Sequence, residues 1–485
     1  MYMMIKNLKL AALNSLMWNA VEKMSGQALR FILTIVIARL VSPADFGLIA
    51  MLSIFLSVAQ SFIDCGFYNA LVQKQDRTEV DYSTMFYSNV LISVVVYFFL
   101  YWSAPYIASF YSQPELKQIT RVMGVSLIIS AFRIVQQAKL VIALNFRIQA
   151  VFSVIAVVVS GLIGIYMAYH QFGVWALVVQ SLVSAFISTV SFWIYSRWMP
   201  LWTFSIQSFQ ELFSFGSKLL LAGVLHTIYS NLYTIVIGRK FSSVDLGFFS
   251  RGQTMAYFVP SNMTNIVTMA MYPILCSIQD DYVKLKKTFK VYIRLVCFIF
   301  FPIMIILAVL SEPIIKIVLT DKWLPSVFYV QILCIAYMWD PLMRINANIL
   351  SVVGRTDYSL KSEIIKKVIS VIVLFITIPF GIDVMCIGLA LYCIIDLLVS
   401  TYYVKRIIGL GFWDEMRNIY AFFILSLVIG GVVFVVNIFV ESDLLKIFIG
   451  TLVGIGLYIS MCIIFRIKEV FDFWSIINSY LLQKK

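Results

Sequence analysis

Long apolar stretches follow one another along almost the whole chain, and they limit the possible folds more than any other feature. A membrane-spanning helix needs about 20 predominantly apolar residues, and fourteen stretches meet this description. A chain that is 61% hydrophobic and only 13% charged cannot hide so much apolar surface in a water-soluble core. The sequence therefore predicts an all-α integral membrane protein with about fourteen transmembrane helices. The predicted spans are residues 14–40, 45–68, 85–110, 116–140, 148–169, 173–195, 213–239, 245–276, 290–311, 323–350, 360–380, 382–404, 418–440 and 444–465.

The connections between these spans are short, and their charges predict an orientation. Lys and Arg are concentrated in the cytoplasmic loops of membrane proteins. With the N-terminus in the cytoplasm, 21 Lys and Arg residues fall in cytoplasmic segments and 7 in the opposite loops. An even number of spans then places both termini in the cytoplasm. The first residues lack the small-residue cleavage site of a signal peptide, so we expect them to be retained.

Several classes of function are disfavoured by composition. The formal charge of +13 comes from basic residues scattered between apolar runs, whereas nucleic-acid-binding proteins gather them in a stripe or patch. The seven cysteines stand singly without a Cys-x-x-Cys motif, which disfavours a disulfide framework or a metal site. No Gly-rich phosphate loop of nucleotide hydrolases occurs. We expect no cofactor, no metal and no enzymatic centre.

One segment of the sequence is repeated 200 residues later. Residues 34–50 read TIVIARLVSPADFGLIA and residues 234–250 read TIVIGRKFSSVDLGFFS, with eight identities in register. The shared Arg, Ser, Asp and Gly carry more information than the apolar matches, because they mark a helix end, a turn and the next helix start. An acidic residue at a helix N-terminus satisfies free N–H groups and complements the helix dipole. The pattern predicts a helix–turn–helix corner that is built twice.

A second correspondence extends the repeat. Arg147 matches Arg355, and Phe172–Gly173 matches Phe380–Gly381, at an offset of 208 residues. We therefore predict two homologous six-helix lobes, 1–200 and 201–406, followed by two additional transmembrane helices and a cytoplasmic tail in 407–485. Six spans per repeat is an even number, so both repeats enter the membrane in the same direction. Parallel repeats of this kind are typical of transporters.

Charged and ionisable side chains inside the predicted spans indicate functional sites, because they are costly in a bilayer. In the first span, Glu22 and Arg30 lie eight residues apart on one helical face. His226 lies in the corresponding part of the seventh span and faces the same way in its repeat. We expect about half of these residues to line a shared cavity and the rest to make structural ion pairs. The candidate substrate-binding residues are Glu22, Arg30, Arg133, His226, Arg251 and Arg344.

Three intramembrane acids are candidates for coupling to a cation: Asp64, Asp340 and Asp396. Asp340 and Arg344 are four residues apart, and simple pairing between them is the alternative interpretation. Arginines outnumber acids in the whole set of intramembrane charges. Guanidinium groups bind phosphate and pyrophosphate through paired hydrogen bonds, so the cavity is predicted to receive an anion.

The chain resembles a known family in the motifs ARLVSPADFGLIAM, LFSFGSKLLLAG and VDLGFFSRGQ together with its fourteen spans and six-plus-six repeat. It is similar to the bacterial Wzx-type polysaccharide and O-antigen flippases of the multidrug/oligosaccharidyl-lipid/polysaccharide exporter superfamily. The resemblance covers nearly the whole chain. It implies a multi-pass protein of the bacterial inner membrane that carries a lipid-linked anionic oligosaccharide, on undecaprenyl pyrophosphate, to the periplasmic leaflet by alternating access. It also implies coupling to a Na⁺ or H⁺ gradient and contact with polysaccharide polymerase machinery.

Other functions stay open at this point. A cation-coupled multidrug antiporter of the same superfamily would need a dominant acidic site, and the three candidate acids are scattered over three spans. A lipid II flippase would share the fold and the basic cavity, and no motif separates the two. A membrane polymerase or ligase would need a large periplasmic loop, and the predicted loops are short.

Overall fold

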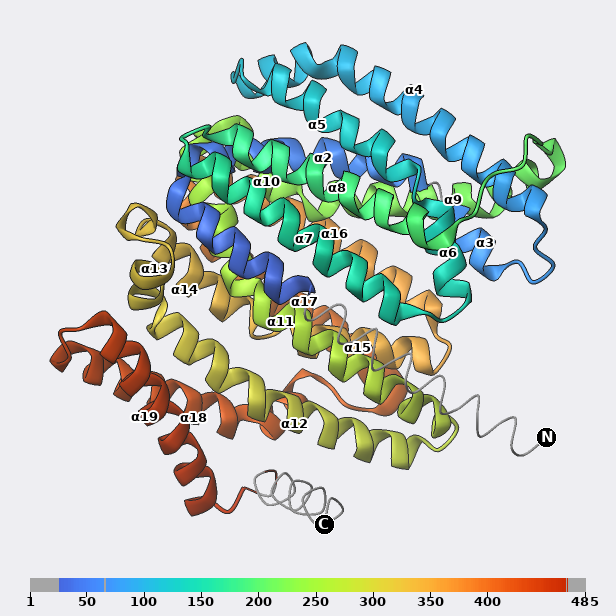
Figure 1. Ribbon diagram of the computed structural model, residues 1–485. Coiled ribbons are helices and arrows are strands. Elements are labelled where there is room, and N and C mark those ends of the chain that lie inside the picture. The colour runs from blue at the N-terminus through green and yellow to red at the C-terminus, as the bar shows by residue number, and fades with distance from the viewer. Residues whose placement is uncertain (1–25, 65–66, 468, 470–485) are drawn as a thin grey trace, which may run out of the picture. The chain divides into compact units, whose positions relative to one another are not determined.

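The computed structural model describes residues 26–64, 67–467 and 469, and within them the chain is helical and forms no β-strand (Figure 1). The helices fall into two compact units, Met1–Ser250 and Arg251–Lys485. The all-α prediction is confirmed. Candidate Glu22 lies outside the described residues.

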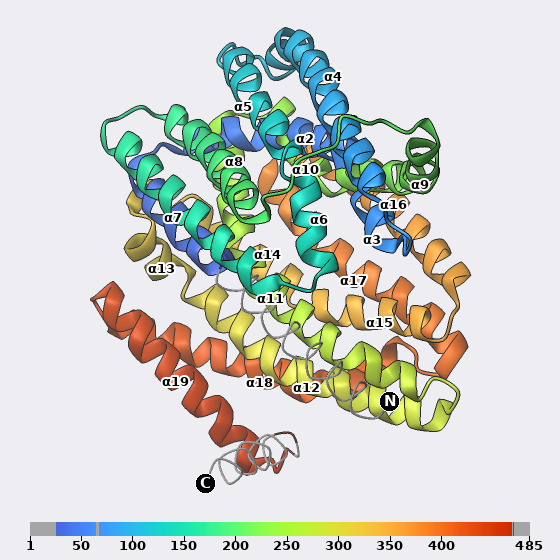
Figure 2. The same ribbon diagram turned by 45° about the vertical axis from the view of Figure 1, so that its right-hand side comes forward.

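In the described part of the N-terminal unit, residues 26–40 are helical and a series of helical hairpins follows them. α4 and α5 lie side by side, as do α7 and α8 (Figures 1 and 2). The helices after the first are α2 (Pro43–Asp64), α3 (Phe67–Gln73), α4 (Glu79–Tyr111), α5 (Leu116–Ala131), α6 (Ile134–Ile142), α7 (Phe146–Tyr169), α8 (Val174–Ser196), α9 (Ile206–Ser230), α10 (Leu232–Lys240) and the first turns of α11 (Ser243–Ser277).

The C-terminal unit contains most of α11 and the helices that follow it. α12 packs against α18, and α16 packs against α17. The helices after α11 are α12 (Tyr282–Val309), α13 (Ser311–Val318), η1 (Asp321–Trp323), α14 (Ser326–Tyr337), α15 (Asp340–Val352), α16 (Thr356–Thr377), η2 (Ile378–Phe380), α17 (Ile382–Ile408), α18 (Phe412–Phe439) and α19 (Asp443–Ile464).

Nine helical stretches of the described chain are long and apolar enough to cross a membrane, counting α14 and α15 together as one. A tenth is gained if α5 and α6, which meet at a bend of 42°, form one broken span. The predicted span 213–239 is also interrupted, because α9 ends at Ser230 and α10 begins at Leu232. The chain is thus a multi-pass membrane protein, while the count of fourteen spans and the layout of the repeats stay predictions.

The predicted corner is present at both places, with the same hydrogen bonds. At the first corner the Ser42 hydroxyl donates to Asp45 at 2.6 Å and accepts from the Asp45 backbone N–H at 3.2 Å. At the second corner Ser242 and Asp245 make the same two bonds at 2.7 and 3.1 Å. Each serine thereby caps the helix that follows, α2 or α11, and the carboxylate holds the turn in place.

The two corners also touch each other, at what we call the corner contact. A Cβ atom added to Gly47 would lie 1.7 Å from the carbonyl oxygen of Ser243, and one added to Gly247 would lie 1.9 Å from that of Pro43. Only glycine allows two backbones to approach so closely. The shared glycine of the repeat is therefore explained by packing of one corner on the other.

The boundary between the compact units lies later in the chain than the predicted lobe boundary at residue 200. α9 packs against α2, α3 and α4, and α10 packs against α2. These contacts place the start of the predicted second repeat inside the N-terminal unit, which ends at Ser250.

Candidate polar cavity

Two adjoining polar cavities lie within the N-terminal unit. Their volumes are about 590 and 420 Å³, and both have Ser130 and Arg133 in their walls. We call the larger one the carboxylate cavity, because it contains Asp64, and the smaller one the serine cavity. The serine cavity contains Arg30 and seven serines, which come from α5, α7 and α8.

Arg133 reaches both cavities because the helix path is broken beside it. α5 ends at Ala131 and α6 begins at Ile134, so the arginine lies at the 42° bend. Its guanidinium donates a hydrogen bond to the Ser188 hydroxyl of α8 at 2.5 Å. The sequence indicated a continuous span here, and the break gives this arginine its central position.

The C-terminal part of α2 supplies polar groups to the carboxylate cavity. Gln60 and Asp64 are one turn apart, and the amide donates to the carboxylate at 2.8 Å. The hydroxyls of Ser61 and Thr227 lie 3.5 Å apart and link α2 to α9. The candidate His226 is the neighbour of Thr227 and is exposed on α9.

The composition of the two cavities defines the ligands that they suit. Two guanidinium groups and one carboxylate leave an excess of positive charge, and guanidinium recognises phosphate oxygens through its fixed fork of donors. Serine hydroxyls and glutamine amides both donate and accept hydrogen bonds, which matches the hydroxyl groups of a sugar. The cavities are therefore suited to an anionic molecule that carries hydroxyl groups.

The candidates Asp340 and Arg344 lie together in the C-terminal unit, at the start of α15. Arg344 Nε lies 3.0 Å from Asp340 Oδ2, so the pairing suggested by their spacing is confirmed. Arg344 also donates to the Tyr257 hydroxyl of α11 at 2.8 Å. The Tyr257 ring packs edge-on against Tyr337, whose hydroxyl accepts from Gln253 at 3.0 Å. This polar cluster joins α11, α14 and α15.

Asp396 makes an ion pair between α16 and α17. Its carboxylate lies 3.4 Å from the ammonium group of Lys366 and accepts a hydrogen bond from the Ser400 hydroxyl at 3.1 Å. The Lys366 side chain is only 8% exposed and also pairs with Glu363 at 2.6 Å. Lys366 is thus a nearly buried cation that two carboxylates share.

Arg251 is buried in the C-terminal unit near the start of α11. Its guanidinium carbon lies 5.7 Å from the centre of the Trp323 ring, and Trp323 is fully buried. A cation over an aromatic face is stabilised by the ring quadrupole. The arginine thus packs on an aromatic partner of its own unit.

Three further features were not predicted from the sequence. The serines of the serine cavity are individually unremarkable in membrane helices. The buried Glu415 of α18 stands just before a predicted span. The third feature is an ion-pair cluster, which we call the latch, made by Lys74, Asp81 and Glu211.

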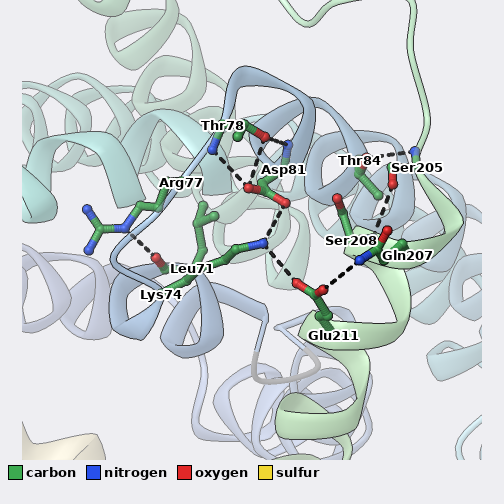
Figure 3. Close-up of polar contacts among 10 residues, drawn as sticks. All are labelled: Leu71, Lys74, Arg77, Thr78, Asp81, Thr84, Ser205, Gln207, Ser208 and Glu211. Atoms are coloured by element: carbon green, nitrogen blue, oxygen red, sulfur yellow. Dashed lines mark hydrogen bonds and ion pairs between the residues drawn. The ribbon is translucent and has the colours of Figure 1, made fainter.

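The latch ties the loop between α3 and α4 to the first turns of α9 (Figure 3). The Lys74 ammonium lies 3.0 Å from Asp81 and 2.9 Å from Glu211. The hydrogen bond to Glu211 raises the pKa of Lys74 above its usual value, so the ammonium is charged at neutral pH. Close by, the Thr84 hydroxyl accepts from the Ser205 backbone N–H at 3.1 Å, which fixes the start of α9 against α4.

Comparison with known proteins identifies the family. The family described as "Polysaccharide biosynthesis protein" matches residues 36–328. The chain belongs to this family. Its relatives include the "Uncharacterized membrane protein in cps region" of Klebsiella pneumoniae, 24% identical over 90% of this chain and 96% of that protein. The "Lipopolysaccharide biosynthesis protein WzxC" of Escherichia coli is 22% identical over 84% of each chain.

A solved structure shows the same fold at low identity. The "Lipid II flippase MurJ, inward closed conformation" superposes with a TM-score of 0.72 and 15% identity, over 92% of this chain and 98% of that one. The resemblance to polysaccharide flippases that the motifs indicated is confirmed at the level of the family. The protein is a multi-pass membrane protein of polysaccharide biosynthesis.

Proposed function

We propose that the protein is a flippase that moves an undecaprenyl-pyrophosphate-linked oligosaccharide from the cytoplasmic to the periplasmic leaflet of the bacterial inner membrane. The observation that carries this proposal is the pair of cavities joined at Arg133, which offers cationic and hydroxyl groups inside an otherwise apolar helical unit. Such polar surface is costly beside lipid unless a polar ligand uses it. The names of its relatives from polysaccharide biosynthesis agree with this substrate class.

Within this proposal the residues of the cavities have separate tasks. Arg30 and Arg133 bind the pyrophosphate, and the surrounding hydroxyls and amides replace water around the sugars. The polyprenyl tail stays in the bilayer, so only the polar part of the substrate must cross. No covalent chemistry is required, and the protein acts as a transporter and has no enzymatic activity.

Alternating access requires contacts that open in turn on the two sides. With the predicted lobes, 1–200 and 201–406, the corner contact joins one repeat to the other, and so does the latch. With both termini in the cytoplasm, the latch lies on the cytoplasmic side and the corner contact on the periplasmic side. We propose that these contacts are the inner and outer gates, and that each must separate when the cavity opens to its side.

Cation coupling is assigned to Asp64 within the same proposal. Asp340 and Asp396 already have cationic partners at 3.0 and 3.4 Å, whereas Asp64 lines the carboxylate cavity beside an amide. If the rate of export in vesicles responds to neither a Na⁺ gradient nor an H⁺ gradient, the assignment of cation coupling to Asp64 is wrong. Contact with the polysaccharide polymerase stays a prediction from the family resemblance.

The test of the proposed site removes one guanidinium at a time. We expect Arg133→Ala to reduce polysaccharide export at least tenfold, because a charge-assisted bidentate contact is lost from the substrate. Arg30→Ala should have a similar effect, and Arg133→Lys should retain part of the activity. The control is Lys117→Ala, which removes an exposed positive charge outside both cavities.

Membrane abundance of each variant is measured beside export. Normal abundance and undiminished export for both alanine variants would refute the proposed role of the arginines. Export of normal polysaccharide with accumulation of lipid II in the deletion strain would instead favour a lipid II flippase. Increased drug sensitivity alone would favour a multidrug antiporter.

A further inference from the structure

The C-terminal unit contains a buried carboxyl group that differs from the other buried acids. Three acidic side chains are buried in the described part of the chain: Asp81, Glu415 and Glu469. Asp81 pairs with Lys74 at 3.0 Å, and Glu469 pairs with Arg294 at 3.0 Å. Glu415 is 1% exposed, and no cationic side chain of the described residues pairs with it.

The Glu415 side chain accepts a hydrogen bond from the neighbouring helix α15. The Asn346 amide of α15 donates to Glu415 Oε2 at 3.1 Å, and Asn346 is itself fully buried. Within the described part of the chain, no group donates to Glu415 Oε1 or to Asn346 Oδ1. A charged carboxylate would add a further acceptor to a place that lacks donors, whereas a protonated carboxyl would supply a donor.

Nearby charged groups do not compensate a negative charge on Glu415. On α12, Arg294 is directed to Glu469 and to the backbone carbonyl of Asn418. Lys286, also on α12, donates to the backbone carbonyl at the end of α17 at 3.2 Å. Asp414, the neighbour on α18, is an acid and accepts from the Gly411 N–H at 3.0 Å.

The remaining helices packed against α18 contribute weak or committed polar groups. The Cys297 thiol of α12 is fully buried. From α19, the Tyr458 hydroxyl donates to the carbonyl oxygen of Phe298 at 2.8 Å, and Cys462 is buried. From α17, the aliphatic part of Lys405 packs against Gly411.

The N-terminal dipole of α18 favours a negative charge near its first turn, and burial opposes it. Asp414 already uses a capping position there through its bond to Gly411. Moving an unpaired carboxylate out of water costs more free energy than the helix dipole contributes. A carboxyl group buried in this way therefore takes up a proton.

We infer that Glu415 is a proton-binding site of the C-terminal unit, and that it holds its proton while α12, α15 and α18 are packed together. Separation of these helices admits water, and the carboxyl group then releases the proton. This inference does not depend on which molecule the protein transports.

Infrared spectroscopy tests the resting protonation state on the full-length protein in lipid nanodiscs. We expect a carbonyl band of a protonated carboxylic acid at neutral pH, and the band should shift when glutamate carries a ¹³C-labelled carboxyl. The band should disappear in Glu415→Gln. It should persist in Glu312→Gln, which changes a glutamate whose side chain is 55% exposed.

A second measurement follows the linkage between the proton and the packing. The buried Cys297 thiol reacts with N-ethylmaleimide only when the helices separate, and mass spectrometry identifies its adduct. We expect the ratio of the labelling rates, wild type to Glu415→Gln, to rise with pH by up to about tenfold per pH unit. The variant at the same pH controls for the intrinsic reactivity of the thiol.

Two results would overturn the inference. The first is an absence of any protonated glutamate band in the labelled wild-type protein at neutral pH, which decides the question even if Glu415→Gln fails to fold. The second is a labelling ratio that does not change with pH.

Discussion

Asp64 and Asp396 are both acids of predicted spans, yet their surroundings differ. Asp396 faces the Lys366 ammonium, which is nearly buried, and Asp64 faces the Gln60 amide in a cavity. Losing one partner of a buried ion pair typically costs about 3–5 kcal/mol, because the other charge stays behind. At the scale of residues, an acid held in an ion pair is therefore distinguished from one that lines a cavity, although the sequence presented the two as equivalent.

The Asp396→Asn variant should be less stable by about 1–3 kcal/mol, since Lys366 loses one partner and keeps Glu363. The measurement is the free energy of unfolding in mixed micelles. Asp64→Asn is the matched control, and its stability should change by less than about 0.5 kcal/mol. Equal losses of stability in the two variants would contradict the distinction.

At the scale of helices, the repeated corners show what a sequence can and cannot predict. The spacing of Ser and Asp in both copies predicted two capped helix starts, since capping depends on residues three positions apart. It gave no indication that the two starts touch, because that contact joins residues about 200 positions apart. The break between α5 and α6 was also missed, since no Pro or Gly marks it.

The corner contact leads to a prediction about replacing either of its glycines by alanine, which adds one methyl group. Gly47→Ala and Gly247→Ala should each lower stability by about 1–3 kcal/mol, because the new Cβ overlaps a backbone carbonyl that cannot move aside. Gly431→Ala is the control, since a Cβ there meets no atom within 4 Å and alanine favours a helix. Thermal unfolding of the three variants in one detergent is the measurement. A neutral result at both corners would show that the helices do not approach so closely.

The latch leads to a prediction about cross-links. A cleavable bis-maleimide cross-linker long enough to replace the two side chains, attached to Lys74→Cys and Glu211→Cys, should block export because it holds the proposed inner gate closed. Cleavage of the linker by a reducing agent should restore export. The control attaches the same linker to Lys139→Cys and Glu79→Cys, an ion pair within the first predicted repeat whose Lys139 Nζ lies 3.0 Å from Glu79 Oε1. That cross-link should form and leave export intact. Full export with the latch cross-linked would refute its role as a gate.

At the scale of the whole chain, hydropathy was enough to predict a helical membrane protein, and the motifs were enough to indicate its family. The candidate site was predicted only in part. Arg30, Arg133 and Asp64 do line adjoining cavities. Arg344 and Asp340 pair with each other, and Arg251 packs on an aromatic ring. Helical periodicity shows which residues share one face of a helix. It does not show which other helix or side chain that face contacts.

The central claim is that the protein moves a lipid-linked oligosaccharide between leaflets. The most direct test extracts undecaprenyl-linked oligosaccharides from a deletion strain and determines their leaflet with a glycan probe confined to the periplasm. We predict that completed units accumulate out of reach of the probe, and that the wild-type chain, unlike Arg133→Ala, restores their exposure. Normal labelling of completed units in the deletion strain would contradict the claim.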